Sequence, residues 1–414
     1  MPDSFPARAS VPRIFLTGVI ALLCGHTLAA QDILMTPPTE PVLPQVLRET
    51  APPPPASRLP ATSESPFKIG PVVFRPRLSY GYTNAEGLPA PDGRRVASEI
   101  HRISSGVTAD LGHRWTLDYS PNWLYYTARA MEDSFDQSAT LSGAASLQSW
   151  NFTFSESYSA SAPLLVETGR QTEQESWATS LGAFYSISPA LQLQVSGSMN
   201  ERYAENTPMT RGWSGQVRAS WQASPRLSLS LGPGFNYTEI ADAADTYGET
   251  YTGQISWQPV HKISVSLDGG MQYTHSKSAA AVDLSNPILN LSLGYQPFET
   301  TSVSLALSRT VSTSYFKDQV TKDIRWNLGV QQRLLGHCYL SASYSRYRND
   351  YTATNALTSA PREDTVEAYS VRLSTRLFDR IAVSASFQEN NNDSNLEAFS
   401  FSSKQYGVEL SWQF

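Results

Sequence analysis

Apolar and polar residues alternate along the segment Tyr406–Phe414. Tyr, Val, Leu, Trp and Phe occupy its even positions, whereas Gly, Glu, Ser and Gln occupy the odd ones. Successive side chains of a β-strand point to opposite faces, so this pattern predicts a strand with one apolar side and one polar side. Such a strand separates two different environments.

The same alternation recurs along the chain from about residue 70. Strand-like segments of roughly ten residues are joined in turn by a tight turn, such as Gly112-His113 or Ser224-Pro225, and by a longer polar connection. We therefore predict an all-β fold, a transmembrane antiparallel up-and-down β-barrel of about eighteen strands, with sixteen as the alternative. An even number of strands places both ends of the barrel on the periplasmic side.

The longer connections are rich in Asn, Asp, Ser, Thr and Gly, which is the composition of exposed loops. We expect them to face the cell exterior: Thr83–Ala97, Pro163–Thr172, Ala204–Arg211, Glu239–Thr246, Thr274–Ser285, Asp350–Arg362 and Glu389–Glu397. None stands out as an element that folds into the lumen and constricts it. The sequence therefore favours a monomeric channel over a trimeric general porin.

The segments before the barrel have compositions of their own. Residues 1–30 resemble a cleaved export signal, because Arg8 and Arg13 precede or flank the short apolar run Ile14–Leu23 and Ala29-Ala30 follows it. Residues 31–66 form a Pro-rich periplasmic linker, which we expect to be disordered. Residues 67–414 are the predicted barrel, and the predicted location is the bacterial outer membrane.

Charge and composition agree with a membrane barrel and argue against a soluble domain and against a nucleic-acid-binding protein. Charged residues make up 16% of the chain, below the roughly 25% of soluble domains. The net charge of -6 is spread along the sequence without a basic patch, so nucleic acid is not an expected partner. The expected partners are outer-membrane lipid and the barrel-assembly machinery.

The sequence offers no site for catalysis. It contains no GxSxG, no GxxxxGK[ST] and no His or Cys cluster at metal-ligand spacing. The six His residues lie in the leader, at turns or at loop borders, where none meets an acid and a nucleophile. We therefore predict a protein that is not an enzyme and that needs no cofactor and no metal.

The polar face of the strands is where a transported solute would bind. A charge on the lipid face costs roughly 2–4 kcal/mol near the midplane, so charged strand residues belong in the lumen. Arg residues suit carboxylates and phosphates, which makes anionic solutes or an acidic polysaccharide candidate ligands. The alternative, which we weigh more heavily for any single residue, is charge pairing, for example of Glu409 with Arg75 and Arg77. The predicted lumen-lining candidates are Arg75, Arg77, Asp110, Asp118, Arg218, Asp268, Arg325, Arg372, Arg376 and Glu409.

The barrel resembles the outer-membrane porin family associated with exopolysaccharide gene clusters. The resemblance is carried by the opening segment Phe74–Tyr82, the repeated hairpins and the closing segment Tyr406–Phe414. The family's acidic run after the first strand is reduced here to Asn84-Ala-Glu86. The resemblance implies a conduit, and the strand count is also similar to that of the alginate exporter. It further implies that Tyr406, Trp412 and Phe414 serve as an assembly signal.

Two functions of different classes follow from these expectations. The first is a porin-like outer-membrane channel that passes small solutes or serves as the exit for an exopolysaccharide. The second is a non-conducting surface adhesin or receptor that uses the barrel as an anchor. The moderate length of the predicted outer loops favours the channel.

Overall fold

The computed structural model describes residues 67–90, 94–165, 170–205, 207–241, 244–277, 284–313, 319–353, 362–378 and 380–413. These residues form a closed antiparallel barrel of 18 strands, as the sequence predicts. The barrel strands are β2 (Val72–Pro89), β3 (Arg95–Leu111), β4 (Trp115–Tyr126), β5 (Ser134–Leu147), β6 (Trp150–Ser161), β9 (Gln174–Ser188), β10 (Leu191–Ala204), β11 (Thr210–Ser224), β12 (Leu227–Ile240), β13 (Thr246–Val260), β14 (Ile263–Ser276), β15 (Leu284–Phe298), β16 (Thr301–Thr313), β17 (Gln319–Arg333), β18 (Cys338–Ala353), β19 (Arg362–Phe378), β20 (Ile381–Ser394) and β21 (Phe401–Gln413).

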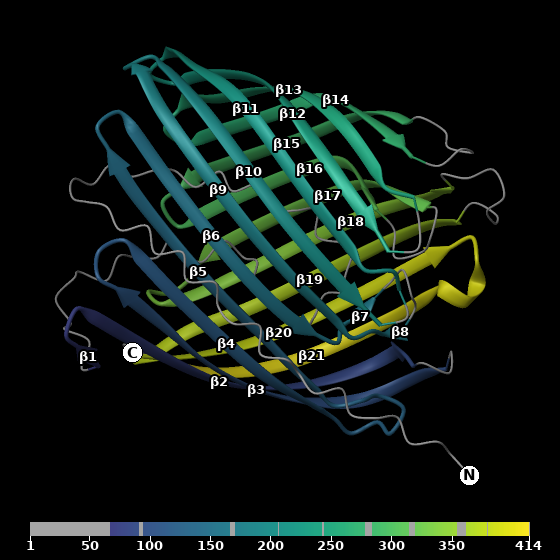
Figure 1. The fold of residues 1–414 in the computed structure, drawn as a ribbon. Coiled ribbons are helices and arrows are strands. Elements are labelled where there is room, and N and C mark those ends of the chain that lie inside the picture. The colour runs from purple at the N-terminus through teal and green to yellow at the C-terminus, as the bar shows by residue number, and fades with distance from the viewer. Residues whose placement is uncertain are drawn as a thin grey trace.

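Each strand pairs with its neighbours in the chain, and the first and last barrel strands close the ring. β2 pairs with β21 from Arg77 opposite Gln413 to Glu86 opposite Lys404. In Figure 1 the purple-blue β2 and the yellow β21 accordingly lie side by side. The short strand β1 (Lys68–Ile69) adds to the end of β2. A closed ring leaves no sheet edge unpaired, which a barrel in lipid requires.

The two ends of the barrel differ in the length of their connections. At one end, here called the turn end, strands follow one another after two to four residues, and Gly112 there has φ +72°, a conformation that L side chains rarely adopt. At the opposite end, the loop end, β20 and β21 are joined by six residues that include the 3-10 helix η1 (Glu397–Phe399). The predicted contrast between tight turns and longer connections is present.

Several strands run further than the sequence predicts. β2 continues to Pro89 and β20 to Ser394, through residues that the composition assigns to exposed loops. Their side chains point into the barrel, where Thr83, Ala85, Asn390 and Asn392 are buried. The expectation of exposed loops was wrong there, because polar side chains alternate with other polar side chains and the period of two cannot be seen.

The outer surface of the barrel is apolar and exposed. Leu117, Leu181, Leu231 and Val371 are among its exposed large side chains. Aromatic side chains from neighbouring strands pack together on it, such as Tyr158 with Trp177 and Tyr344 with Tyr369. An apolar surface with aromatic groups is the surface that a lipid bilayer solvates. No helix among the described residues is long and apolar enough to span a membrane.

Some sequence predictions lie outside the described residues. The export signal, the Pro-rich linker and the terminal Phe414 are among them, and they remain predictions. Tyr406 and Trp412 lie in β21, and the Tyr406 ring packs against Phe387 of β20 on the outer surface. Whether these residues act as an assembly signal also stays a prediction.

Candidate transport path

The inner wall of the barrel is polar, and part of it is exposed to the lumen. Ser, Asn and Gln dominate the inward positions of β10, β11 and β15 to β17. We call this region the open sector and define it by seven exposed inward residues: Ser198, Asn200, Ser214, Asn290, Ser292, Ser304 and Asn327. Small hydroxyl and amide side chains leave room along this wall and can exchange hydrogen bonds with a passing solute.

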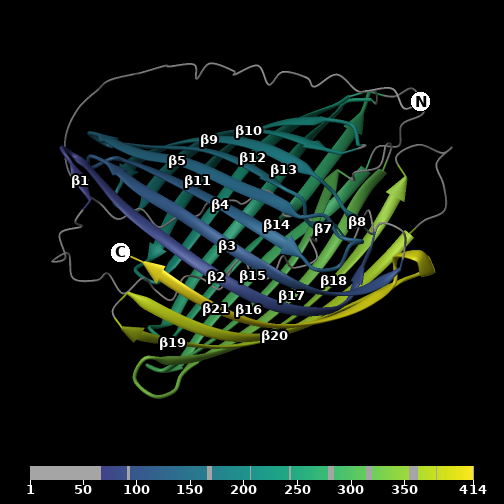
Figure 2. The same cartoon turned by 90° about the horizontal axis from the view of Figure 1, so that it is seen from below.

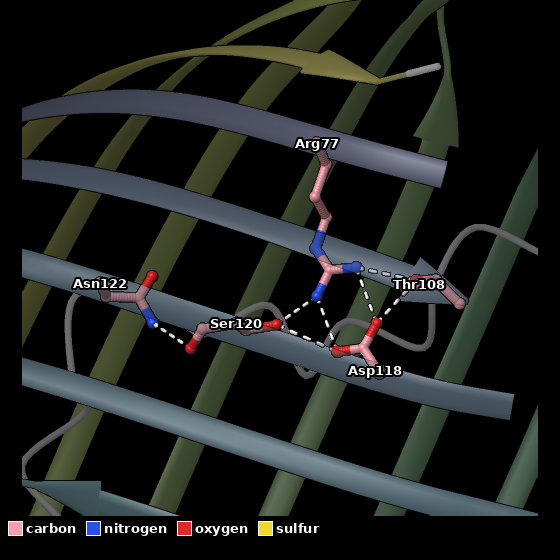
Figure 3. Close-up of polar contacts among 5 residues, drawn as sticks. All are labelled: Arg77, Thr108, Asp118, Ser120 and Asn122. Carbon is pink, nitrogen blue, oxygen red and sulfur yellow. Dashed lines mark hydrogen bonds and ion pairs between the residues drawn. The ribbon is translucent and has the colours of Figure 1, made fainter. Parts of the chain in front are cut away.

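A second feature of the wall is the ion pair between Arg77 of β2 and Asp118 of β4 (Figure 3). Both terminal nitrogens of Arg77 donate to the carboxylate at 2.7 Å, and Thr108 of β3 and Ser120 of β4 also bond to it. The guanidinium lies across Gly106 of β3, where an added Cβ would come within 2.7 Å of its Nε. Glycine at this position therefore lets the arginine lie flat against the wall and join β2 to β4.

The other predicted lumen charges form similar pairs across strands. Arg75 pairs with Asp110, and Arg218 of β11 reaches Asp268 of β14 at 3.2 Å and Gln254 of β13 at 2.8 Å. Arg372 of β19 reaches Glu409 of β21 at 3.0 Å. The specific expectation that Glu409 pairs with Arg75 and Arg77 was wrong, because both of these arginines turn toward β3 and β4, on the opposite side of β2 from β21.

Two of the ten predicted residues remain to be placed. Arg325 lies 3.4 Å from Asp323 of its own strand, and Arg376 is exposed near the turn end of β19. All ten side chains lie on the inward face by strand register. The structure therefore brings most of the arginines together with carboxylates, whereas direct contact of any of them with a solute stays a prediction.

The loop-end half of β18 to β21 and β2 to β4 is packed rather than open. Asp323, Asn349 and Asp364 stand opposite one another on β17, β18 and β19, and each has an exposed fraction of 0%. Arg362 holds Asp364 through two hydrogen bonds of 3.0 and 2.5 Å, and its guanidinium lies 3.5 Å from the centre of the Phe399 ring. Buried charges of this kind are tolerated only when they are paired.

An inward segment between β6 and β9 completes this packing. We call it the strap and define it as residues 162–165 and 170–173, with the two short strands β7 (Leu164–Leu165) and β8 (Arg170–Gln171). Leu164 packs against the inward residues Val366 and Phe401 and against a cluster that includes Ile100 and Leu124. In both views β7 and β8 lie within the outline of the barrel (Figure 1, Figure 2).

The strap joins walls that are far apart around the ring. Leu165, with an exposed fraction of 1%, packs against Ala204 at the end of β10, while the adjacent Leu164 contacts β19 and β21. β10 and β19 lie opposite each other in the strand order. Gln171 in turn exchanges hydrogen bonds of 2.9 and 3.2 Å with the backbone of Glu132 in the β4–β5 connection. We call the strap and the buried inward side chains around it the packed sector.

The strap overturns two expectations from the sequence. Pro163–Thr172 does not face outward as a whole, and the barrel does have an inward element that narrows its lumen. The signal that sequence reasoning missed is the pair Leu164-Leu165, two large apolar residues in a connection taken to be exposed. Burying Leu165 removes its apolar surface from water and stabilises the inward position by about 1.5–3 kcal/mol, and the partly buried Leu164 adds a smaller contribution.

Sequence reasoning also missed the buried charges of the packed sector. Asp323 shares the inward parity of Arg325, which was predicted, and Arg362 and Asp364 share that of Arg372. Their positions near or within predicted loops concealed them. The described residues contain no group of three or more His, Cys, Asp or Glu that could hold a metal ion.

Comparisons with known proteins find similarity at the level of solved structures only. No protein-family model matches the chain, and no curated protein sequence does. The outer membrane protein opdK of Pseudomonas aeruginosa is 12% identical, with 83% of this chain and 99% of that chain covered and a TM-score of 0.43. OccAB3 of Acinetobacter baumannii is 9% identical, with coverages of 82% and 99% and a TM-score of 0.45.

A receptor barrel is similar to this chain to about the same degree. The siderophore receptor PirA of Acinetobacter baumannii is 8% identical, with 82% of this chain and 80% of that chain covered and a TM-score of 0.42. Similarity at this level carries no inference about what the present chain transports or binds.

Proposed function

We propose that the protein is a bacterial outer-membrane channel of the porin kind, which lets small hydrophilic solutes diffuse through its lumen. The observation that carries the proposal is the open sector, a wall of exposed Ser and Asn side chains on the inward face of the barrel. Barrels of 16 to 18 strands enclose an aqueous channel when their lumen is not filled. The apolar outer surface requires a membrane, and the closed barrel form is that of outer-membrane proteins.

Two finer functions from the sequence are weighed against this proposal. An exit conduit for an acidic exopolysaccharide would use the lumen arginines, but Arg75, Arg77, Arg218 and Arg372 are already held by carboxylates. The strap also narrows the lumen that a polymer would thread. A surface anchor without conduction would leave the exposed hydroxyl wall without a role. The small-solute channel therefore accounts for more of the structure.

Single-channel recording in planar bilayers tests the proposal. We expect the purified protein to give stable open steps in 1 M KCl, and we expect anionic oligosaccharides in either chamber to leave these steps unblocked. Block by the oligosaccharides would favour the polysaccharide conduit instead. A protein that is folded, as judged by its heat-dependent shift on electrophoresis, yet silent in the bilayer would overturn the channel and favour the anchor.

A further inference from the structure

The described connecting residues at the two ends of the barrel carry opposite net charge. Among the described residues that connect strands at the turn end, four are basic, Arg114, Arg226, Lys262 and Arg380, and one is acidic, Glu299. Among those that connect strands at the loop end, six are acidic and three are basic. The acidic ones are Glu132, Asp133, Glu173, Glu205, Asp245 and Glu397, and the basic ones are Arg94, Arg129 and Lys277.

Two of these four basic side chains, those of Arg226 and Lys262, lie on the rim between β11 and β14, within the span of the open sector. Arg226, in the turn before β12, donates a hydrogen bond of 2.8 Å to the carbonyl oxygen of Pro259. Lys262, in the turn after β13, donates one of 2.8 Å to the carbonyl oxygen of Pro297. Each cation therefore bridges to the end of a neighbouring strand, β13 or β15, through a neutral acceptor, and this bond orders the side chain without neutralising it.

The lumen just inside this rim adds further positive charge. Arg333 at the end of β17 and Arg376 near the end of β19 lie on the inward face and are exposed. The carboxylate nearest to this mouth on the inner wall, Asp110, is held by Arg75. Charges of one sign around the mouth of a low-dielectric channel focus the field and concentrate ions of the opposite sign.

We infer that the turn end is an electropositive mouth that draws small anions into the open sector, and that the channel consequently rectifies current. The inference rests on the proposed function, since only an open channel has a current. When the loop side is positive, cations enter through the acidic end and anions through the basic end, so both accumulate in the lumen and conductance rises. The reverse voltage draws both kinds of ion out of the lumen and lowers conductance.

Recordings from single channels in neutral phosphatidylcholine bilayers test this inference. In 0.1 M KCl, where the Debye length is about 10 Å, we expect the current at 100 mV with the loop side positive to exceed the reverse current about twofold. In 1 M KCl the Debye length falls to about 3 Å, and the ratio should approach one. Streptavidin added to one chamber identifies the loop side when Glu397→Cys is biotinylated in a Cys338→Ser background.

A matched pair of variants locates the effect. Arg226→Gln, Lys262→Gln and Arg376→Gln together remove three charges from the turn end while glutamine can still donate to the carbonyls, and the ratio should fall toward one. The control, Arg94→Gln, Arg129→Gln and Lys277→Gln, removes three charges from the loop end and should leave the ratio the same or larger. Linear currents in the wild type, or a ratio that the first variant does not change, would overturn the inference while leaving the channel intact. Absence of any current from folded protein would instead overturn the proposed function.

Discussion

The packed sector and the open sector line the same lumen but are built for different tasks. In the packed sector Asp323, Asn349 and Asp364 are fully buried beside the apolar strap. In the open sector the inward Ser198, Ser214 and Ser304 remain exposed. The difference lies in side-chain size and in what crosses the lumen, since the strand pairing is the same throughout. A barrel wall can therefore be part core and part channel without any change of fold.

Removing the strap should have the largest effect, because it should make the packed sector resemble the open sector. Thr172 donates a backbone hydrogen bond of 3.0 Å to Pro163, so the two ends of the segment are adjacent and Gly-Gly can replace residues 164–171. Exposing the inner face of the packed sector should widen the path and raise the unitary conductance about twofold. Single-channel recording measures it, and an unchanged conductance would show that the strap does not limit the channel.

A carboxylate introduced into the packed sector should destabilise the protein more than one introduced into the open sector. Both effects should be smaller than that of removing the strap. Both side-chain amide atoms of Asn349 are buried without a hydrogen-bond partner, and Asn349→Asp would place a third carboxylate between Asp323 and Asp364. We expect this to lower the free energy of unfolding by about 1–3 kcal/mol. Ser304→Asp in the exposed open sector is the matched change. It should leave the free energy of unfolding unchanged within experimental error.

Urea titration of the two variants in lipid vesicles, followed by tryptophan fluorescence, measures both stabilities. Equal midpoints would mean that the two sectors do not differ in burial. Ser304→Asp should also shift the ion selectivity toward cations, since its charge meets the solute path. Asn349→Asp should not, because its charge is enclosed.

The smallest expected effect on stability comes from Gly106, across which the guanidinium of Arg77 lies. Gly106→Ala would place a Cβ 2.7 Å from the Nε of Arg77 and force the guanidinium away from Asp118. Because about a third of each side chain of the Arg77–Asp118 pair is exposed, solvent screening limits the loss of stability to about 1 kcal/mol or less. Gly197→Ala is the control, since its Cβ would meet nothing closer than 3.7 Å. If the two variants unfold at the same urea concentration, the placement of Arg77 against the wall makes no measurable contribution to stability.

The sequence predicts the architecture well because one physical contrast governs it. Wherever lipid lies on one side and water on the other, as along β21, the alternation of Leu410 and Trp412 with Glu409 and Ser411 is explicit. Where both sides are polar, as around Asn390 and Asn392, the alternation disappears and the sequence predicts a loop. The parity of Arg77 and Asp118 places both inside, but their pairing depends on strand register, which parity alone does not give.

The strap shows a different limit of the sequence. Leu164 and Leu165 are conspicuous in a polar connection, but their partners, Val366, Phe401 and Ala204, lie far away in the chain. No local pattern connects them.

The contacts of the strap constrain the order in which the barrel can assemble. Leu164 belongs to the first third of the ring, whereas Val366 and Phe401 are delivered by the last strands, and β2 meets β21 only when the ring closes. Contacts between residues so distant in sequence form late, because the chain between them must first be brought together. Until closure, Leu164 lacks its contacts with Val366 and Phe401, although its contacts with the early strands and those of Leu165 with Ala204 do not need the last strands. The packing of the strap is therefore complete only in a closed barrel, and the contact of Leu164 with Val366 and Phe401 would mark the end of folding.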